Sequence, residues 1–335
     1  MSLEQPHGSL QRTEKSGLDP WATFFAAVAS GVFGMLCVSL SVSIAGRYGL
    51  MLFVGLPVIV GAVASLVYSY KRPLTSAWQA AKLAVVVGSV LCGGLLLSGS
   101  EGVLCLLMAL PLALPLTMFG GVAGYALLRA MTRHRSAFAA PLFLCCSFPL
   151  GLGVEWARKS EPPLRSVTTA IEITGSPQQV WDALIAFAPI ATPPQGWFRF
   201  GIAYPIGAKI VGRGVGAVRY CQFSTGSFVE PITLWDEPWR LAFDVAETPV
   251  PMREVSFYEN LDPPHLHGMF QSHNGEFRLT ALSHNTVRLT GTTWYHHDLW
   301  PSVYWGLISD RLIHQIHRRV LVHIQEQVET SRPKA

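Results

Sequence analysis

Three ionisable side chains near the end of the chain have types and spacings suited to acid–base chemistry. Asp310, His314 and His317 are separated by four and three residues within the segment 300–329. These intervals bring side chains onto one face of an α-helix. A carboxylate that orients a histidine whose pKa lies near neutrality can promote abstraction of a proton next to a carbonyl group.

Two other roles fit the same three residues. A buried Asp and His can simply satisfy each other, or bond to Tyr295 or Tyr220, because a bare buried polar group costs about 1–3 kcal/mol. They can also orient the polar head of an otherwise hydrophobic ligand. The residues alone leave the structural, the binding and the catalytic role open.

The segment 300–329 is expected to form a long amphipathic helix. Its apolar residues recur at helical spacing and define one stripe. Asp310 and His317 fall within this stripe, and His314 lies at its edge. The stripe consists of Ile313, Val320, Leu321, Ile324 and Val328, and the opposite face carries Arg311, Gln315, Arg318, Gln325 and Glu329. The polar residues of the stripe therefore line an interior wall.

The preceding residues have the pattern of an antiparallel sheet. A strand at 166–174 is followed by a helical segment at 175–187, where Ser176 can cap the N-terminus and Pro177 suits the first turn. Alternating segments separated by Gly, Pro, Asp and Asn then predict strands. These strands are 207–214, 217–225, 227–235, 239–245, 254–260, 275–282 and 286–297. This order, closed by the long helix, predicts an α+β fold.

Strand parity predicts which side chains face the interior, because successive side chains of a strand point to opposite faces. The apolar parity of 286–297 includes Tyr295 and His297, and that of 217–225 includes Tyr220. Glu230 and Glu259 share parity with apolar neighbours. The predicted ligand-binding set is Tyr220, Glu230, Glu259, Tyr295, His297, Asp310, His314 and His317. If the protein is an enzyme, the catalytic candidates are Asp310, His314, His317 and Tyr295.

Two sequence stretches carry a resemblance to a known superfamily. They are "VTTAIEITGSPQQVWDALIAF" and "FVEPITLWDEPWRLAFDV", and the terminal helix completes the pattern. Residues 166–330 resemble the helix-grip fold of the START/polyketide-cyclase-like superfamily, also called SRPBCC. The resemblance implies a cavity between sheet and helix that binds a hydrophobic small molecule or lipid. It also admits a cyclase or dehydratase type of enzyme, and we expect no cofactor in either case.

Histidines raise a third alternative, a histidine-rich periplasmic metal-binding protein. Nine of the eleven histidines follow residue 165, and they include "HLH" at 265–267 and "HxxH" at 314–317. Such pairs can bind Zn²⁺ or Cu²⁺. No HExxH or CxxC motif supports them, so we assign no metal site from the sequence. The nine are His265, His267, His273, His284, His296, His297, His314, His317 and His323.

The first half of the chain has the composition of a membrane protein. Charged residues make up only 14% of the whole chain, against about a quarter in an average protein, and only eight lie between Trp21 and Val154. Apolar runs of this kind are long enough to cross a bilayer. The predicted spans are 21–45, 48–70, 79–98, 102–128 and 137–154. The fold expected overall is an α-helical membrane bundle, residues 21–155, joined to the helix-grip domain by a linker at 156–165.

The distribution of Lys and Arg predicts the orientation. With the tail 1–20 in the cytoplasm, eight of these residues lie inside and four outside. Five spans then place the C-terminal domain outside, at the inner membrane of a bacterium facing the periplasm. If the fifth segment does not cross, the domain is cytoplasmic. The bundle serves as anchor and scaffold, or forms a groove that cooperates with the domain. A net charge of +4 argues against nucleic acid as a partner.

Overall fold

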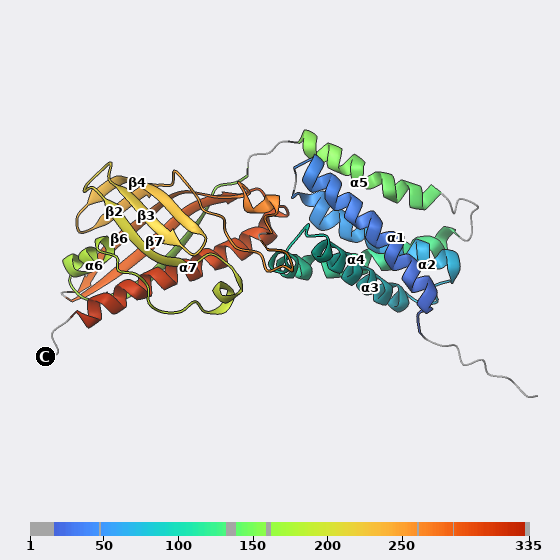
Figure 1. The fold of residues 1–335 in the computed structure, drawn as a ribbon, viewed down its shortest axis with the longest axis horizontal. Coiled ribbons are helices and arrows are strands. Elements are labelled where there is room, and N and C mark those ends of the chain that lie inside the picture. The colour runs from blue at the N-terminus through green and yellow to red at the C-terminus, as the bar shows by residue number, and fades with distance from the viewer. Residues whose placement is uncertain are drawn as a thin grey trace, which may run out of the picture.

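The protein forms a helical bundle and a sheet-and-helix domain placed end to end (Figure 1). The computed structural model describes residues 17–46, 48–131, 139–158, 162–259, 261–283 and 285–331. The bundle contains α1 (Pro20–Ser39), α2 (Leu56–Lys71), α3 (Ala77–Leu97), α4 (Val103–Met131) and α5 (Ala139–Ala157). Short π-helical turns at Leu40–Ile44 and Met51–Gly55 extend α1 and α2 toward each other.

Close approach of backbones holds α2 against α4. A Cβ added at Gly61 would stand 2.0 Å from the carbonyl oxygen of Thr117, and one at Gly120 would stand 2.0 Å from that of Val58. Only glycine fits at such distances. The small residues of the apolar segments thus serve close helix packing, as membrane helices require.

Polar contacts identify the two ends of the bundle. At one end, the Asp19 amide donates to the Tyr68 hydroxyl (2.8 Å), and Arg72 lies 3.7 Å from the Asp19 carboxylate. At the other end, Glu155 accepts from the amides of Leu50 (2.6 Å) and Met51 (3.0 Å). The start of α1 and the end of α5 therefore lie at opposite ends of the bundle.

Four helical segments of the described residues are long and apolar enough to cross a membrane. They are Pro20–Ser43, Met51–Lys71, Ala77–Leu97 and Val103–Met131. The apolar part of α5 described with its side chains, Phe143–Ala157, is shorter than these. Residues 137 and 138 of the predicted fifth span lie outside the described residues, so the five-span arrangement remains a prediction.

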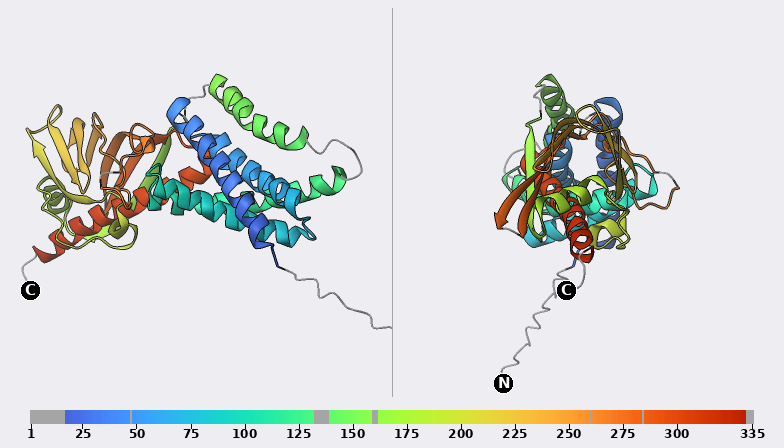
Figure 2. Two further views of the ribbon diagram at one scale, coloured as in Figure 1. Left: turned by 45° about the vertical axis from the view of Figure 1, so that its right-hand side comes forward. Right: turned by 90° about the vertical axis from the view of Figure 1, so that its left-hand side faces the viewer.

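The C-terminal half has the predicted helix-grip fold. Seven antiparallel strands form one sheet in the order β1-β7-β6-β5-β4-β3-β2, which curls along α7 (Figure 2). A capping box formed by Ser176 and Gln179 starts α6 (Pro177–Ile185). The strands are β1 (Arg165–Thr174), β2 (Pro205–Val211), β3 (Val218–Phe223), β4 (Gly226–Asp236), β5 (Arg240–Asp244), β6 (Phe270–Ser283) and β7 (Thr286–His297), and α7 is Ser302–Thr330.

The core of this half confirms the predicted stripe of α7. All five apolar residues of the stripe are buried: four of them, including Leu321 and Ile324, lie in the main core of this half, and Ile313 packs with Val167 and Tyr295 of the sheet. Two fully buried residues of β7, Val287 and Leu289, face the same core. The predicted parity of β7 is therefore correct, and it places Tyr295 and His297 in the interior.

The predicted strand 254–260 is wrong. Residues 254–259 form no strand, and residue 260 lies outside the described residues. The Val103 amide donates to the Val255 carbonyl (2.9 Å), and the Tyr258 hydroxyl donates to the Leu97 carbonyl. Phe257 is 80% exposed. A backbone carbonyl and a tyrosine hydroxyl thus tie this segment to the bundle end, while its alternating apolar side chains Val255 and Phe257 stay exposed.

The domain packs directly on the bundle through the start of α7. Trp305 is buried against Phe53, with ring centroids 4.8 Å apart. The Tyr304 hydroxyl donates to the Met108 carbonyl (2.5 Å), and the Trp300 amide donates to the Tyr48 carbonyl (3.1 Å). The two halves are therefore joined by a packed interface as well as by the linker, of which residues 159–161 lie outside the described residues.

Candidate functional site

Three apolar cavities follow one another from the bundle into the domain. The sheet cavity, about 110 Å³, lies between the inner face of the sheet and α7 and is lined by Phe277, Gly291 and Val320 among others. The junction cavity, about 120 Å³, is lined by residues of both halves, such as Met108 and Leu312. The bundle cavity, about 130 Å³, lies among the helices. The predicted cavity between sheet and helix is thus present, and it adjoins two further cavities.

A buried ion pair forms the most polar part of the sheet cavity. The Arg219 guanidinium donates to the Glu230 carboxylate, and both side chains are almost fully buried. The guanidinium lies 5.3 Å from the ring centroid of Phe243 and 5.5 Å from that of Phe277. Burial raises the pKa of Glu230 despite the opposing effect of Arg219. The interior position predicted for Glu230 is confirmed.

The inward position predicted for Tyr220 is wrong. Tyr220 is 38% exposed, whereas its neighbours Arg219 and Cys221 are buried and line the sheet cavity. Parity alone assigned the aromatic side chain to the interior and the charged one to solvent. In the structure Arg219 faces the interior and Tyr220 faces solvent. Arg219 can be buried because it stands opposite Glu230 in the β3–β4 register, where its charge is neutralised.

His317 is the only one of the three opening candidates, Asp310, His314 and His317, that lines a described cavity. Its Nδ1 lies 3.1 Å from the Thr169 hydroxyl, and its Nε2 lies 2.8 Å from the Thr293 hydroxyl. Burial, followed by the nearby His314, lowers the pKa of His317 to about 4. The ring is therefore neutral at pH 7 and offers the cavity a polar, uncharged wall.

Asp310 is engaged elsewhere. Its carboxylate accepts from Arg165 Nη2 (2.6 Å) and from the Tyr295 hydroxyl (2.5 Å). Burial alone would raise the pKa of Asp310, but the hydrogen bonds from Arg165 and Tyr295 outweigh it and lower the pKa. His314 bonds instead to Thr169 (2.8 Å) and is largely exposed. The candidates thus form two separate hydrogen-bonded groups, one around Asp310 and one around Thr169.

The remaining predicted ligand-binding residues have different surroundings. His297 is buried, and burial followed by the charge of Arg165 lowers its pKa. Glu259 is exposed and lies outside the sheet cavity, so its predicted inward position is wrong. It lines a polar pocket of about 460 Å³ at the bundle end, together with Glu101 and Asp262.

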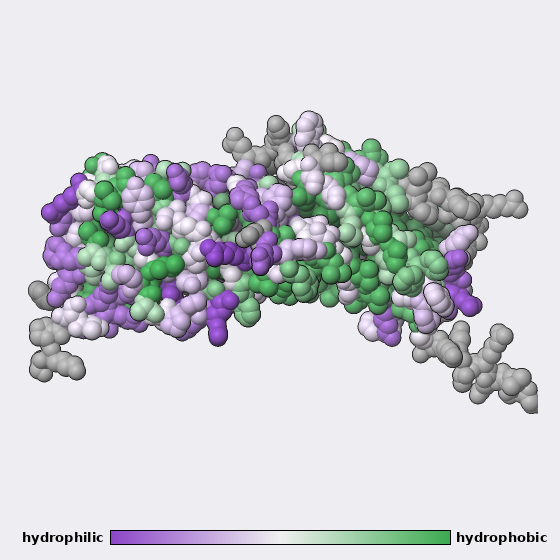
Figure 3. Space-filling view, viewed as in Figure 1, coloured by the Kyte–Doolittle hydropathy of each residue, from purple (hydrophilic) through white to green (hydrophobic). Residues whose placement is uncertain are grey.

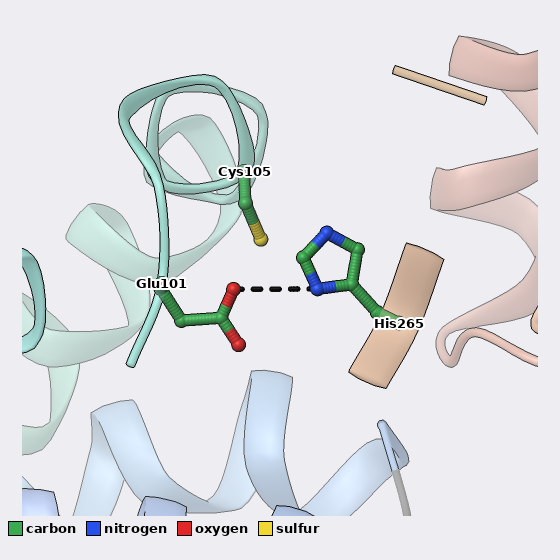
Figure 4. Close-up of side chains that lie close together, drawn as sticks. All are labelled: Glu101, Cys105 and His265. Carbon is green, nitrogen blue, oxygen red and sulfur yellow. Dashed lines mark ion pairs between the residues drawn. The ribbon is translucent and has the colours of Figure 1, made fainter. Parts of the chain in front are cut away.

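Sequence reasoning missed a buried group of ionisable residues where the two halves meet. Glu101 precedes α4, Cys105 lies in its first turn, and His265 comes from the loop between β5 and β6 (Figure 4). Their ligand atoms all lie within 4.8 Å of one another. The "HLH" signal singled out His265, but its partners are distant in the sequence. His267 points elsewhere, 2.6 Å from Asp262, and His284 lies outside the described residues.

No family model and no curated protein matches the chain. Several solved structures are similar to about half of it. A norcoclaurine synthase from Thalictrum flavum, solved with dopamine and hydroxybenzaldehyde, is 12% identical over 52% of this chain and 91% of its own, with a TM-score of 0.33. The Zhui aromatase/cyclase from Streptomyces sp. R1128 is 14% identical over 50% and 94%, with a TM-score of 0.35. A START superfamily protein from Mycobacterium smegmatis is 11% identical over 50% and 99%, with a TM-score of 0.34.

Proposed function

We propose that this chain is a membrane protein whose helix-grip domain takes up a hydrophobic small molecule or lipid directly from its own helical bundle. One observation carries the proposal: the junction cavity is walled by both halves and adjoins a cavity on each side. An apolar molecule gains free energy in such surroundings roughly in proportion to the apolar area removed from water.

Shared wall residues connect the cavities. The junction cavity shares Phe228, Phe270 and Ile316, among others, with the sheet cavity. It shares Tyr48 and Phe53 with the bundle cavity. A cavity of about 10–15 Å³ holds a single water. Each of these three cavities is several times larger, so each has room for several ligand atoms. Small rotations of shared side chains would join the cavities into one path that avoids bulk water.

The polar groups of the sheet cavity suit a ligand with one polar end. The Arg219–Glu230 pair and the neutral His317 ring lie at the far end of the path from the bundle. Such groups fix the orientation of an otherwise apolar ligand. A cyclase or dehydratase would need an acid and a base beside the substrate. Asp310 is held by Arg165 and lines none of the three cavities, so binding is the better supported role.

The surface supports residence in a membrane. Apolar side chains form a broad band over the bundle, whereas the domain surface is mixed and mostly polar (Figure 3). We infer a bacterial inner membrane with five crossings and the domain outside. The bundle end away from the domain carries Lys71, Arg72 and Arg129, which fits the positive-inside rule. The sequence-based orientation rested on twelve Lys and Arg residues. Six of these lie outside the described residues: Arg12, Lys15, Arg47, Arg133, Arg135 and Lys159.

The proposal is tested by identifying molecules that copurify with the full-length protein. After gentle detergent extraction, native mass spectrometry and analysis of an organic extract should show an apolar molecule retained in about a 1:1 ratio. Protein that retains nothing above the background of bulk lipid would overturn the proposal. Conversion of the retained molecule during incubation would favour the enzyme alternative.

A variant and a matched control localise the binding. Ile316 lines both the sheet and the junction cavity. The larger side chain of Ile316→Trp should occupy part of both cavities and lower the amount of copurifying molecule at least about tenfold. Arg318→Trp places the same ring two residues away on the exposed face of α7 and should retain the molecule. Equal retention by both variants would place the ligand outside these cavities.

A further inference from the structure

The junction between bundle and domain buries more ionisable groups than it neutralises. Glu101 is 5% exposed and His265 7% exposed, and the Glu254 side chain is fully buried. Among the described residues, the only ion-pair partner of either carboxylate is His265, which lies 3.3 Å from Glu101 and 3.7 Å from Glu254. One imidazole cannot neutralise two ionised carboxylates, and a buried charge without a counter-charge is costly in a dry interior.

Several polar atoms of this group lack hydrogen bonds. Neither ring nitrogen of His265 has a hydrogen-bond partner among the described residues, and neither does Oε2 of Glu101. The other oxygen of Glu101 accepts from the Tyr48 hydroxyl at 2.9 Å. The carboxylate is thus held by Tyr48 while its free oxygen faces the imidazole and the thiol of Cys105 (Figure 4). Buried polar atoms in folded proteins are nearly always satisfied, so these free atoms point to a missing partner.

We propose that Glu101, Cys105 and His265 bind a divalent transition-metal ion, with Zn²⁺ the best match. Their ligand atoms lie within 4.8 Å of one another, and Glu101 and His265 are already 3.3 Å apart. Donors around a tetrahedral zinc stand about 3.3–3.6 Å apart, and zinc accepts thiolate, imidazole and carboxylate together. The two separations that involve Cys105, each at most 4.8 Å, need only shorten to the zinc range to complete the geometry.

The surroundings supply the outer contacts that such sites need. Glu254 stands beside the second nitrogen of His265, as carboxylates commonly do behind a metal-bound imidazole. Glu254 is itself fixed by the amides of Leu104 and Cys105, both at 3.1 Å, at the start of α4. Glu101 also lines the polar pocket that holds Glu259 and Asp262. This acidic pocket offers a cation a path from water.

Three protein ligands leave one position of a tetrahedral ion open. Cys105 and His265 line the junction cavity, so the open position faces the space between bundle and domain. The metal site does not depend on the proposed ligand, because the ion is measured directly. A failure to find a copurifying apolar molecule would therefore leave this inference intact, and the reverse also holds.

The test uses full-length protein in detergent, purified without a histidine tag, stripped with a chelator and then supplied with Zn²⁺ or Co²⁺. We expect about one ion per chain by mass spectrometry of the metal. With Co²⁺ we expect a thiolate-to-cobalt charge-transfer band in the near ultraviolet and strong visible bands of tetrahedral cobalt. Fewer than about 0.2 ions per chain, or a cobalt spectrum without the thiolate band, would overturn the inference.

Matched variants assign the ligands. Cys105→Ser, His265→Gln and Glu101→Gln should each lower the affinity for the ion at least about tenfold. Cys92→Ser alters another cysteine of the bundle, and His267→Gln alters an exposed histidine two residues from His265. Both controls should bind like the unaltered protein. Unchanged binding by all three ligand variants would refute the assignment, and the cobalt spectrum of the unaltered protein needs no variant to fold.

Discussion

At the scale of single residues, charge pairing decides which polar side chains are buried. Arg219 enters the sheet interior because Glu230 stands opposite it, while Tyr220 turns outward. Asp310 is satisfied by Arg165 and Tyr295, and His317 by two threonine hydroxyls. The polar residues of the α7 stripe are therefore tied to the sheet, and only His317 also lines a cavity.

Breaking the Arg219–Glu230 pair should destabilise the domain strongly. Arg219→Met leaves the Glu230 carboxylate buried without a partner, and we expect a loss of about 3–5 kcal/mol. The double variant Arg219→Met/Glu230→Met should recover most of that loss. Thermal unfolding followed by circular dichroism provides the measurement.

The exposed pair Arg288–Glu172 serves as the control. Both side chains are about half exposed, so Arg288→Met should cost less than about 1 kcal/mol. A similar small loss for Arg219→Met would show that solvent reaches the buried pair.

His317 should make the stability of the domain depend on pH. Its pKa is about 4 in the folded chain against an ordinary 6.5, so between these values the unfolded chain binds more protons. Stability is then fully present above about pH 6.5 and declines as the pH falls toward 4. His317→Gln should flatten this part of the curve relative to the unaltered protein, whereas His267→Gln should not. Parallel curves for all three proteins would contradict the assigned pKa.

At the scale of elements, α7 connects the two halves. Its C-terminal part is gripped by the sheet, and its N-terminal part packs on the bundle through Tyr304 and Trp305. The loop that replaces the predicted strand 254–260 adds Val255 and Tyr258 to the same interface. The bundle depends in turn on glycine contacts between α2 and α4, which leave no room for side chains.

Adding a side chain at the α2–α4 contact should disrupt the bundle. Gly120→Ala places a Cβ against the Val58 carbonyl, and we expect a loss of at least about 1–3 kcal/mol. Gly93→Ala adds the same methyl group in α3, where nothing lies within 4 Å, and should be tolerated. Thermal stability in detergent, followed by size-exclusion chromatography, distinguishes the two variants. Equal stability would show that α2 and α4 can separate without cost.

At the scale of the whole molecule, the ends of the bundle bear on topology. The start of α1 and the end of α5 lie at opposite ends, as the contacts of Asp19 and Glu155 show. Five passes between the ends fit this arrangement, although the described part of α5 is less extensive than the four candidate spans. In the proposed membrane arrangement, the side on which the domain lies determines the compartment from which the proposed metal ion would come.

Reporter fusions should resolve the topology. Alkaline phosphatase fused after Ala335 should be active. Green fluorescent protein fused at the same position should stay dark, because it does not become fluorescent after export by the general secretory route. These results follow if five spans place the domain outside. Inactive phosphatase together with bright fluorescence would place the domain in the cytoplasm and reduce the number of crossings to four.

The sequence by itself determined the features that depend on local periodicity. Apolar runs predicted the four long bundle helices, and alternation predicted most of the sheet. The 3.6-residue period located the buried stripe of α7, because each pattern records which face of an element avoids water.

Only the tertiary structure decided which distant groups meet. Glu101 and Cys105 join His265 because the loop between β5 and β6 docks on the start of α4. Arg219 faces inward because of its neighbour on another strand. A local pattern reports that a face is buried but not against what. The free energy of a buried charge depends on that partner, so the candidate metal site and the cavities between the halves arise only when the chain folds.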